Sequence, residues 1–369
     1  MWRVVFLVSL FLLSACADMS RLKPEPGAPP PPSHIPATRA SAADAALAPF
    51  EDAALLPPET ARLPYAEGRA YAVLVLLPSP GIVDLSTPEQ ARRGLWRFLN
   101  PLAVQRAGTA LGHLMVGWRC ANGQAGLVSK TGAAGGRGYR LLRQGWGLGA
   151  LLASYDDGRL VPLADLPEAQ RRAMRLGRAR IVAMEISEQG CQRMRGALAD
   201  YLAGPVAAQD RYSMVPTPAR PLGDGCAGFA LCLADRGGAT RTLTPWLTRR
   251  VVLRDSFMGL GETPEPGITM LRTTARAPMP MTRLLLGDWS SGAEVGSVRM
   301  LDLELVQRAL EEAEARAGYT RPQRLNMDDP TNTAAQAAIA RWLDGWRRVT
   351  PVRMGEWRGG VRAVVLHRR

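Results

Sequence analysis

Apolar runs and amphipathic segments alternate over most of the chain. Continuous apolar stretches at residues 69–77, 109–119 and 178–186 are typical of strands buried on both faces. Residues 124–130 follow the second of these after an Asn-Gly dipeptide, which favours a two-residue hairpin turn. The pattern therefore predicts several buried strands, two of them joined in a hairpin.

Other segments have the hydrophobic periodicity of helices. They are residues 90–99, 188–201, 301–317 and 333–346. Ser187 is placed to cap the second helix. Further strands are expected at residues 247–253 and, as a closing edge strand, at 362–366. Because hairpins and short strands dominate the middle of the chain, the expected fold class is α+β with an antiparallel sheet, and not a doubly wound parallel sheet.

The first fifteen residues have the features of a lipoprotein signal peptide. A short basic start precedes an apolar run over residues 4–13, which is too short to span a bilayer. The run ends in Leu-Ser-Ala-Cys16, which is similar to a bacterial lipobox. That resemblance implies removal of residues 1–15 and acylation of Cys16. The alternative interpretation is an ordinary secretory signal with an incidental cysteine.

The expected location is the outer membrane, with the folded part facing the periplasm. Ala17 follows Cys16, where lipoproteins retained in the inner membrane usually carry aspartate, although Asp18 leaves the inner membrane open. Residues 16–66 are rich in proline and alanine and are expected to form a tether. Residues 67–300 are then one folded domain, and residues 301–369 a C-terminal helical extension.

Composition and charge indicate the kinds of surface that the protein meets. The chain has 369 residues, 47% of them hydrophobic, which allows a substantial core. Its formal net charge of +13 suits anionic surfaces such as phospholipid head groups or acidic cell-wall polymers. Nucleic acid is not an expected partner, because no segment interleaves basic and aromatic residues as a nucleic-acid-reading module does.

Four cysteines remain after the proposed signal, and a periplasmic location permits disulfides. Cys226 and Cys232 lie six residues apart in a predicted helix, about 9 Å along its axis, which is beyond disulfide reach. Pairing Cys120 with Cys191 is the connectivity that leaves Cys226 free.

A glycine-rich turn at residues 223–225 delivers Cys226 to the first turn of an apolar helix. The positive end of the helix dipole favours thiolate, the nucleophilic form of cysteine. Cys191 also begins a predicted helix and is therefore a rival nucleophile. Of three histidines, His113 is the one within a predicted core strand, so it is the available base for a cysteine nucleophile.

Each of these residues also has a purely structural interpretation. A single histidine in an apolar strand is commonly a core residue with satisfied hydrogen bonds. A free cysteine in an apolar helix commonly serves as a small hydrophobic residue. Tyr212, upstream of Cys226, is equally consistent with packing beneath the proline-rich loop that follows it.

The segment Gly225–Phe229, written G-C-A-G-F, is similar to the D-C-S-G-F signature of NlpC-type papain-fold cysteine peptidases, which also carry a tyrosine about a dozen residues upstream. In most of that family the histidine follows the cysteine. Here G-H-x-x-V-G, which contains His113, precedes it. That order resembles the circularly permuted branch, which includes lecithin:retinol acyltransferase-like and YiiX-like proteins, and the resemblance covers residues 68–240.

The resemblance implies a permuted papain-like fold, with Cys226 and His113 as the catalytic pair and Tyr212 and Ala227 beside the substrate or oxyanion. Two signature residues differ, since Gly225 and Ala227 replace aspartate and serine. The family's third, polar residue, which orients the histidine, is not assigned.

The hairpin turn limits the candidates for that third residue. A two-residue turn would set Gly132 opposite His113, with Lys130 the nearest long side chain on that face, and lysine cannot accept the imidazole N–H. A register shift of one residue would bring Thr131 or Ser129 there instead.

The expected function is a lipid-anchored periplasmic cysteine hydrolase or acyltransferase that cleaves an amide or ester through a thioester. Cell-wall (peptidoglycan) peptide is the favoured substrate and an acyl-lipid or lipoprotein amide the second. The alternative is a non-catalytic envelope lipoprotein that uses the same fold for binding or structure. No cofactor or metal is expected, because one core histidine and scattered cysteines have no metal-ligand spacing.

Overall fold

The computed structural model describes residues 44–51, 60, 63–81, 84–132, 136–215, 225–262, 265–319, 322, 325–354 and 361–368. The expected signal peptide, Cys16, most of the expected tether and residues 216–224 before the Cys226 helix lie outside this part of the chain.

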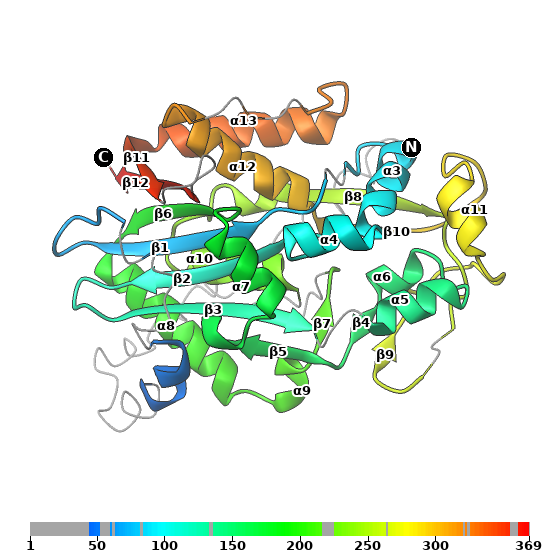
Figure 1. The fold of residues 1–369 in the computed structure, drawn as a ribbon, viewed down its shortest axis with the longest axis horizontal. Helices are drawn as coiled ribbons and strands as arrows, with labels where there is room; N and C mark the ends of the chain where they lie inside the picture. The colour runs from blue at the N-terminus through cyan, green and yellow to red at the C-terminus, as the bar shows by residue number, and fades with distance from the viewer. Residues whose placement is uncertain are drawn as a thin grey trace, which may run out of the picture.

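Seven strands of the described residues form one sheet, in the order β11-β12-β6-β1-β2-β3-β5 (Figure 1). Their bounds are β1 Ala70–Leu77, β2 His113–Arg119, β3 Ala125–Gly132, β5 Gly158–Val161, β6 Arg180–Ile186, β11 Trp346–Met354 and β12 Val361–Arg368. Every neighbouring pair is antiparallel except β12 and β6. The expected α+β class with a mostly antiparallel sheet is therefore confirmed.

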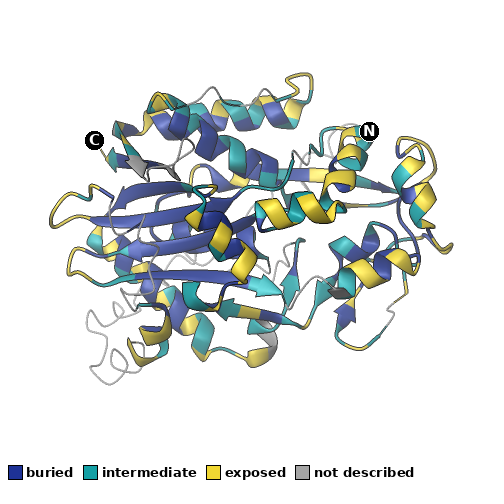
Figure 2. Cartoon of the chain, in the orientation of Figure 1, coloured by how far each residue is buried: buried dark blue, intermediate teal, exposed yellow. Residues whose placement is uncertain are grey.

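Helices cover both faces of this sheet, so its central strands β1, β2 and β6 are buried along almost their whole length (Figure 2). Along β1, Leu74 and Leu76 belong to one core cluster and Val73 and Val75 to another, as the alternation of a strand requires. The first cluster includes residues of α8 Glu188–Ala203, α10 Cys226–Arg236, α12 Leu303–Arg316 and α13 Pro330–Asp344. The second includes residues of α7 Glu168–Arg175.

A third core cluster lies at the end of the sheet where β7, α5 and α6 are grouped in Figure 1. It joins short elements from distant parts of the sequence: α3 Pro88–Phe98, α5 Gly136–Arg143, α6 Gly149–Leu152, α11 Met281–Leu286, and strands β8 Thr248–Arg254 and β10 Glu294–Leu301. Strands β4 Ser154–Tyr155, β7 Tyr212–Ser213 and β9 Ile268–Thr269 form a small sheet beside it. Helices α4 Pro101–Ala107 and α9 Val206–Gln209 complete the longer connections.

The β2–β3 hairpin differs from its predicted register by one residue. Val116 pairs with Val128, so residue 113 is in register with 131 and not with Gly132. The reason is the turn, in which Cys120 N–H donates to the Gln124 carbonyl and encloses three residues. Gly123 takes a φ of +92°, as the last residue of a three-residue hairpin loop does.

The C-terminal segment, expected to be a helical extension with an edge strand at residues 362–366, is part of the main sheet. After α12 and α13, β12 inserts between β6 and β11, so β11 is the edge strand. The strand β11 was not expected, because its sequence W-R-R-V-T-P-V-R-M has four polar residues and a proline among nine and no continuous apolar run. An edge strand needs fewer apolar residues than one between two neighbours, which explains the weak signal.

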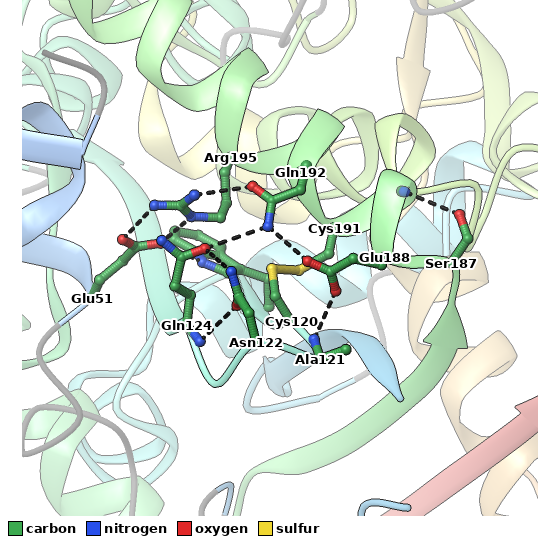
Figure 3. The surroundings of a disulfide bond; sticks show 12 residues. Glu51, Cys120, Ala121, Asn122, Gln124, Ser187, Glu188, Cys191, Gln192 and Arg195 are labelled. Atoms are coloured by element: carbon green, nitrogen blue, oxygen red, sulfur yellow. Dashed lines mark hydrogen bonds and ion pairs between the residues drawn. A yellow bond between two sulfur atoms is a disulfide. The ribbon is translucent and has the colours of Figure 1, made fainter. Parts of the chain in front are cut away.

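Part of the expected tether packs against the domain. Leu47 and Phe50 are buried in the first core cluster. Glu51 accepts hydrogen bonds from Arg195 of α8 and from the Trp118 indole of β2 (Figure 3). Apolar burial and these hydrogen bonds hold residues 44–51 against the folded domain. The tether expected from composition therefore includes residues that belong to the domain.

The disulfide between Cys120 and Cys191 is present as predicted, with Cα atoms 5.6 Å apart (Figure 3). It ties the β2–β3 turn to the first turn of α8. Ser187 accepts the Gly190 N–H and caps α8, also as predicted. Among the described residues, no helix has the length and hydrophobicity that crossing a membrane requires.

Candidate active site

Helix α10 begins at Cys226, with Gly225 as its N-cap residue in an extended conformation. A side chain at position 225 would clash with the Ser213 carbonyl oxygen of β7, so glycine permits the close approach of the two segments. Cys226 is therefore held at the positive end of a helix whose remaining residues are almost all buried.

The Cys226 thiol is buried and hydrogen-bonds with the imidazole of His113. Burial raises the pKa of this thiol, but the hydrogen bond and charge of His113 outweigh it, and so the pKa falls to about 7. The Leu114 backbone N–H and the Tyr212 hydroxyl contribute in the same direction. The thiolate, the nucleophilic form, is therefore accessible near neutral pH.

His113 is fixed by a second hydrogen bond, because its Nε2 lies 2.5 Å from Ser129 Oγ. Ser129 is buried on β3, the neighbouring strand. The backbone pairing of β2 with β3 ends at Val116 and Val128. Beyond this pair, toward His113 and Ser129, the two strands are not paired through their backbones. With Nε2 on Ser129, Nδ1 is the nitrogen left for the Cys226 sulfur.

Tyr212 of β7 lies beside the sulfur. The pKa of its hydroxyl is raised well above the usual range, mainly by burial and next by the charge of the neighbouring Cys226. The hydroxyl therefore stays protonated and donates to the thiolate. The backbone N–H of Cys226 also hydrogen-bonds with the Tyr212 hydroxyl. A Cβ at position 132 would lie 3.0 Å from the Tyr212 ring, so the glycine on β3 makes room for the ring.

Two cavities adjoin this cluster, and they share Tyr212, Ser213 and Met214. The smaller, of about 40 Å³, is lined by Cys226 and Ala227 and by apolar residues of β10 and α12. The larger, of about 250 Å³, is lined by His113 and reaches α5, α7 and β4. A substrate that spans both would pass the sulfur and the imidazole in turn.

The structure thus brings Cys226, His113 and Tyr212 together, with Ala227 next along α10. Cys191, the rival nucleophile, is not a thiol because it forms the disulfide with Cys120. Cys232 has a partner, which leaves Cys226 as the free cysteine among the described residues.

Ser129, one of the two residues that a register shift of one residue was expected to bring to His113, is the hydrogen-bond partner of its ring. Lys130, which a two-residue turn would have placed nearest to His113, is fully buried and hydrogen-bonds with Tyr201 of α8. The sequence signal for Ser129 was the length of the β2–β3 hairpin loop. A loop counted as three residues, the last of them Gly123, gives the register shift of one residue. No cluster of three or more potential metal ligands occurs among the described residues.

Comparisons with known proteins give no relative: no protein-family model matches the chain, and neither curated proteins nor solved structures give a significant match.

Proposed function

We propose that this chain is a cysteine hydrolase or acyltransferase that cleaves an amide or ester through a thioester on Cys226. One observation carries the proposal: a free thiol at a helix N-terminus is hydrogen-bonded to His113, which is hydrogen-bonded in turn to Ser129. Nucleophile, base and orienting group in that order are the arrangement that activates a cysteine.

The reaction follows from the roles of these atoms. The thiol proton passes to His113, Sγ attacks the substrate carbonyl carbon, and the negative charge forms on the carbonyl oxygen. The Cys226 backbone N–H and the Tyr212 hydroxyl, which in the free protein bond to each other and to the sulfur, are the candidate donors to that oxygen and turn to it as the thiolate is consumed. His113 then gives its proton to the departing nitrogen or oxygen as the bond to carbon breaks. Water, or a second acceptor, loses a proton to His113 and attacks the thioester carbon. The carbon–sulfur bond then breaks and the proton on His113 returns to the sulfur, which restores the thiol.

A circularly permuted papain-like fold is part of the proposal. It is supported by the chain order, in which the histidine strand β2 precedes the cysteine helix α10, and by the position of Ser129 on the strand next to His113. Serine differs from the third residues usual in that family, but its hydroxyl can accept the Nε2–H and so orient the ring.

We further propose a periplasmic setting, with acylated Cys16 as the anchor in the outer membrane and cell-wall peptide as the favoured substrate. The Cys120–Cys191 disulfide supports an oxidising compartment. Cys16 lies outside the described residues, so the anchor is tested separately, by incorporation of labelled palmitate into the chain and its loss in Cys16→Ser.

The decisive experiment measures alkylation of Cys226 by iodoacetamide as a function of pH, followed by mass spectrometry of the peptide that contains it. The expected rate rises with pH through an inflection near 7. In His113→Ala the inflection should move up, because the group that stabilises the thiolate is gone, and the rate at pH 7 should fall at least about tenfold.

His367→Ala is the matched control, because His367 lies on β12 and contacts Tyr71 and Glu185, away from the site. It should leave the alkylation profile unchanged. If His113→Ala gives the wild-type profile as well, Cys226 and His113 do not act as a pair, and the chain is better described as a non-catalytic envelope lipoprotein.

A further inference from the structure

Gln170 of α7 is a buried polar side chain without a hydrogen-bond partner for its oxygen. Its exposed fraction is 8%, and its Oε1 has no partner in the protein. The same residue lines the 250 Å³ cavity beside His113. A buried carboxamide oxygen without a partner lowers stability, and a ligand that donates to it recovers that loss.

The charged groups of the cavity are already engaged within the protein. Arg137 lies 2.9 Å from Asp156, 3.3 Å from Glu265 and 3.7 Å from Asp157. Its charge is balanced by these carboxylates, so an ionic ligand gains little there. Gln170, in contrast, offers both an acceptor and an N–H₂ donor, which together match the N–H and C=O of an amide.

The two cavities differ in which residue of the catalytic pair, Cys226 or His113, lines them. His113 lines the larger cavity and not the smaller, whereas Cys226 lines the smaller and not the larger. In acyl transfer the general acid must reach the departing atom. The larger cavity is therefore the place for the leaving group, and the smaller one for the acyl group that stays on sulfur.

The smaller cavity limits that acyl group. Its volume of about 40 Å³ takes roughly three water-sized groups, and Leu301, Leu303 and Met214 line it. A short apolar acyl group fits this space, and a long lipid acyl chain does not.

We propose that Gln170 is a binding residue for the leaving group, and that the substrate has a short apolar group next to the scissile carbonyl and a leaving group that carries an amide. This inference rests on the proposed function and adds the orientation of the substrate. The amide-bearing leaving group lies in the larger cavity, past His113 and toward α7. Gln170 does not touch the reacting atoms, so its effect is on the choice of leaving group.

The test compares two thioesters that transfer the same acetyl group. S-acetyl-N-acetylcysteamine has an amide in its leaving thiol, and S-acetylpentanethiol has a chain of equal length without one. In either reaction the Cys226 Sγ–carbon bond forms, the carbon–sulfur bond to the leaving thiol breaks, and the dyad proton goes to that sulfur. Intact-protein and peptide mass spectrometry under single-turnover conditions give the rate of acetylation of Cys226.

Wild-type protein should be acetylated about fivefold to tenfold faster by the amide-bearing thioester, the effect of one or two hydrogen bonds. Gln170→Met keeps the length of the side chain and removes both polar atoms, so the ratio should fall to near one. Gln105→Met, on exposed α4 and outside the larger cavity, should keep the wild-type ratio.

The outcomes separate this inference from the proposed function. Equal rates with the two thioesters in wild-type protein would overturn the role of Gln170 and leave the dyad intact, and this comparison needs no variant. Transfer from neither thioester, together with slow alkylation by iodoacetamide, would overturn the proposed function itself.

Discussion

His113 Nε2 and Ser129 Oγ lie 2.5 Å apart, across the part of β2 and β3 that no backbone pairing bridges. The hydrogen bond sets the rotation of the imidazole and leaves Nδ1 for the Cys226 sulfur. The geometry of the dyad therefore depends on one serine of the neighbouring strand.

Ser129→Ala should lower the rate of Cys226 acetylation about tenfold, because the imidazole loses the group that orients it. Ser129→Thr keeps a hydroxyl and should restore most of the rate, whereas Ser297→Ala, at an exposed position of β10, should have no effect. The measurement is single-turnover acetylation by S-acetyl-N-acetylcysteamine across pH, with thermal unfolding recorded alongside. A rate for Ser129→Ala equal to that of wild type would exclude the orienting role.

Tyr212→Phe should raise the pKa of Cys226, because the thiolate loses a hydrogen-bond donor while the ring remains against Gly132. Alkylation by iodoacetamide should be slower than wild type at pH 7, by roughly twofold for a rise of about half a pKa unit. The rates should converge at high pH, where both thiols are ionised. Tyr139→Phe, on the exposed face of α5, is the control. A profile identical to wild type would mean that Tyr212 serves packing alone.

Replacing both Cys120 and Cys191 by serine should lower the free energy of unfolding by about 4 kcal/mol, the value for a loop closed over 71 residues. The measurement is urea denaturation with and without the disulfide. The pKa of Cys226 should stay near 7, since Cys120 is at the far end of β2 from His113, about 23 Å along an extended strand. A change in the alkylation profile would show that the disulfide also holds the site.

The buried carboxyl of Asp235, on α10, should make the free energy of unfolding depend on pH. Burial raises the pKa of this carboxyl to about 6, although hydrogen bonds from Thr240 and Thr244 act against the rise. The folded state binds this proton more tightly than the unfolded chain does. The free energy of unfolding should therefore fall, through this group, as pH rises from about 4 to about 6.

Asp235→Asn keeps an acceptor for the two threonines and removes the ionisation. It should flatten this fall and stabilise the protein at pH 7 by about 3 kcal/mol. Urea denaturation at several pH values between 4 and 7 measures both effects, with Asp165→Asn, an exposed residue, as the control. A slope that persists in Asp235→Asn would assign it to other groups.

The sequence alone determined the elements that bury apolar side chains and the main candidates for chemistry. The run that became β1 is hydrophobic along its whole length, and the run that became β6 is hydrophobic apart from Arg180 and Glu185, as expected of strands covered on both faces. His113 was identified by elimination and Cys226 by its position at a helix start. Both arguments need only local information, and the structure brings the two residues together.

Tertiary structure decided what surrounds that pair. The identity of Ser129 depended on a one-residue difference in loop length, because Gly123 permits a three-residue turn where Asn-Gly also suits a two-residue one. Gln170 could not be recognised from the chain, since nothing in α7 distinguishes it from an ordinary helical glutamine. Its meaning comes from burial at the cavity that His113 also lines, 57 residues away in sequence, and only packing brings the two residues to one cavity.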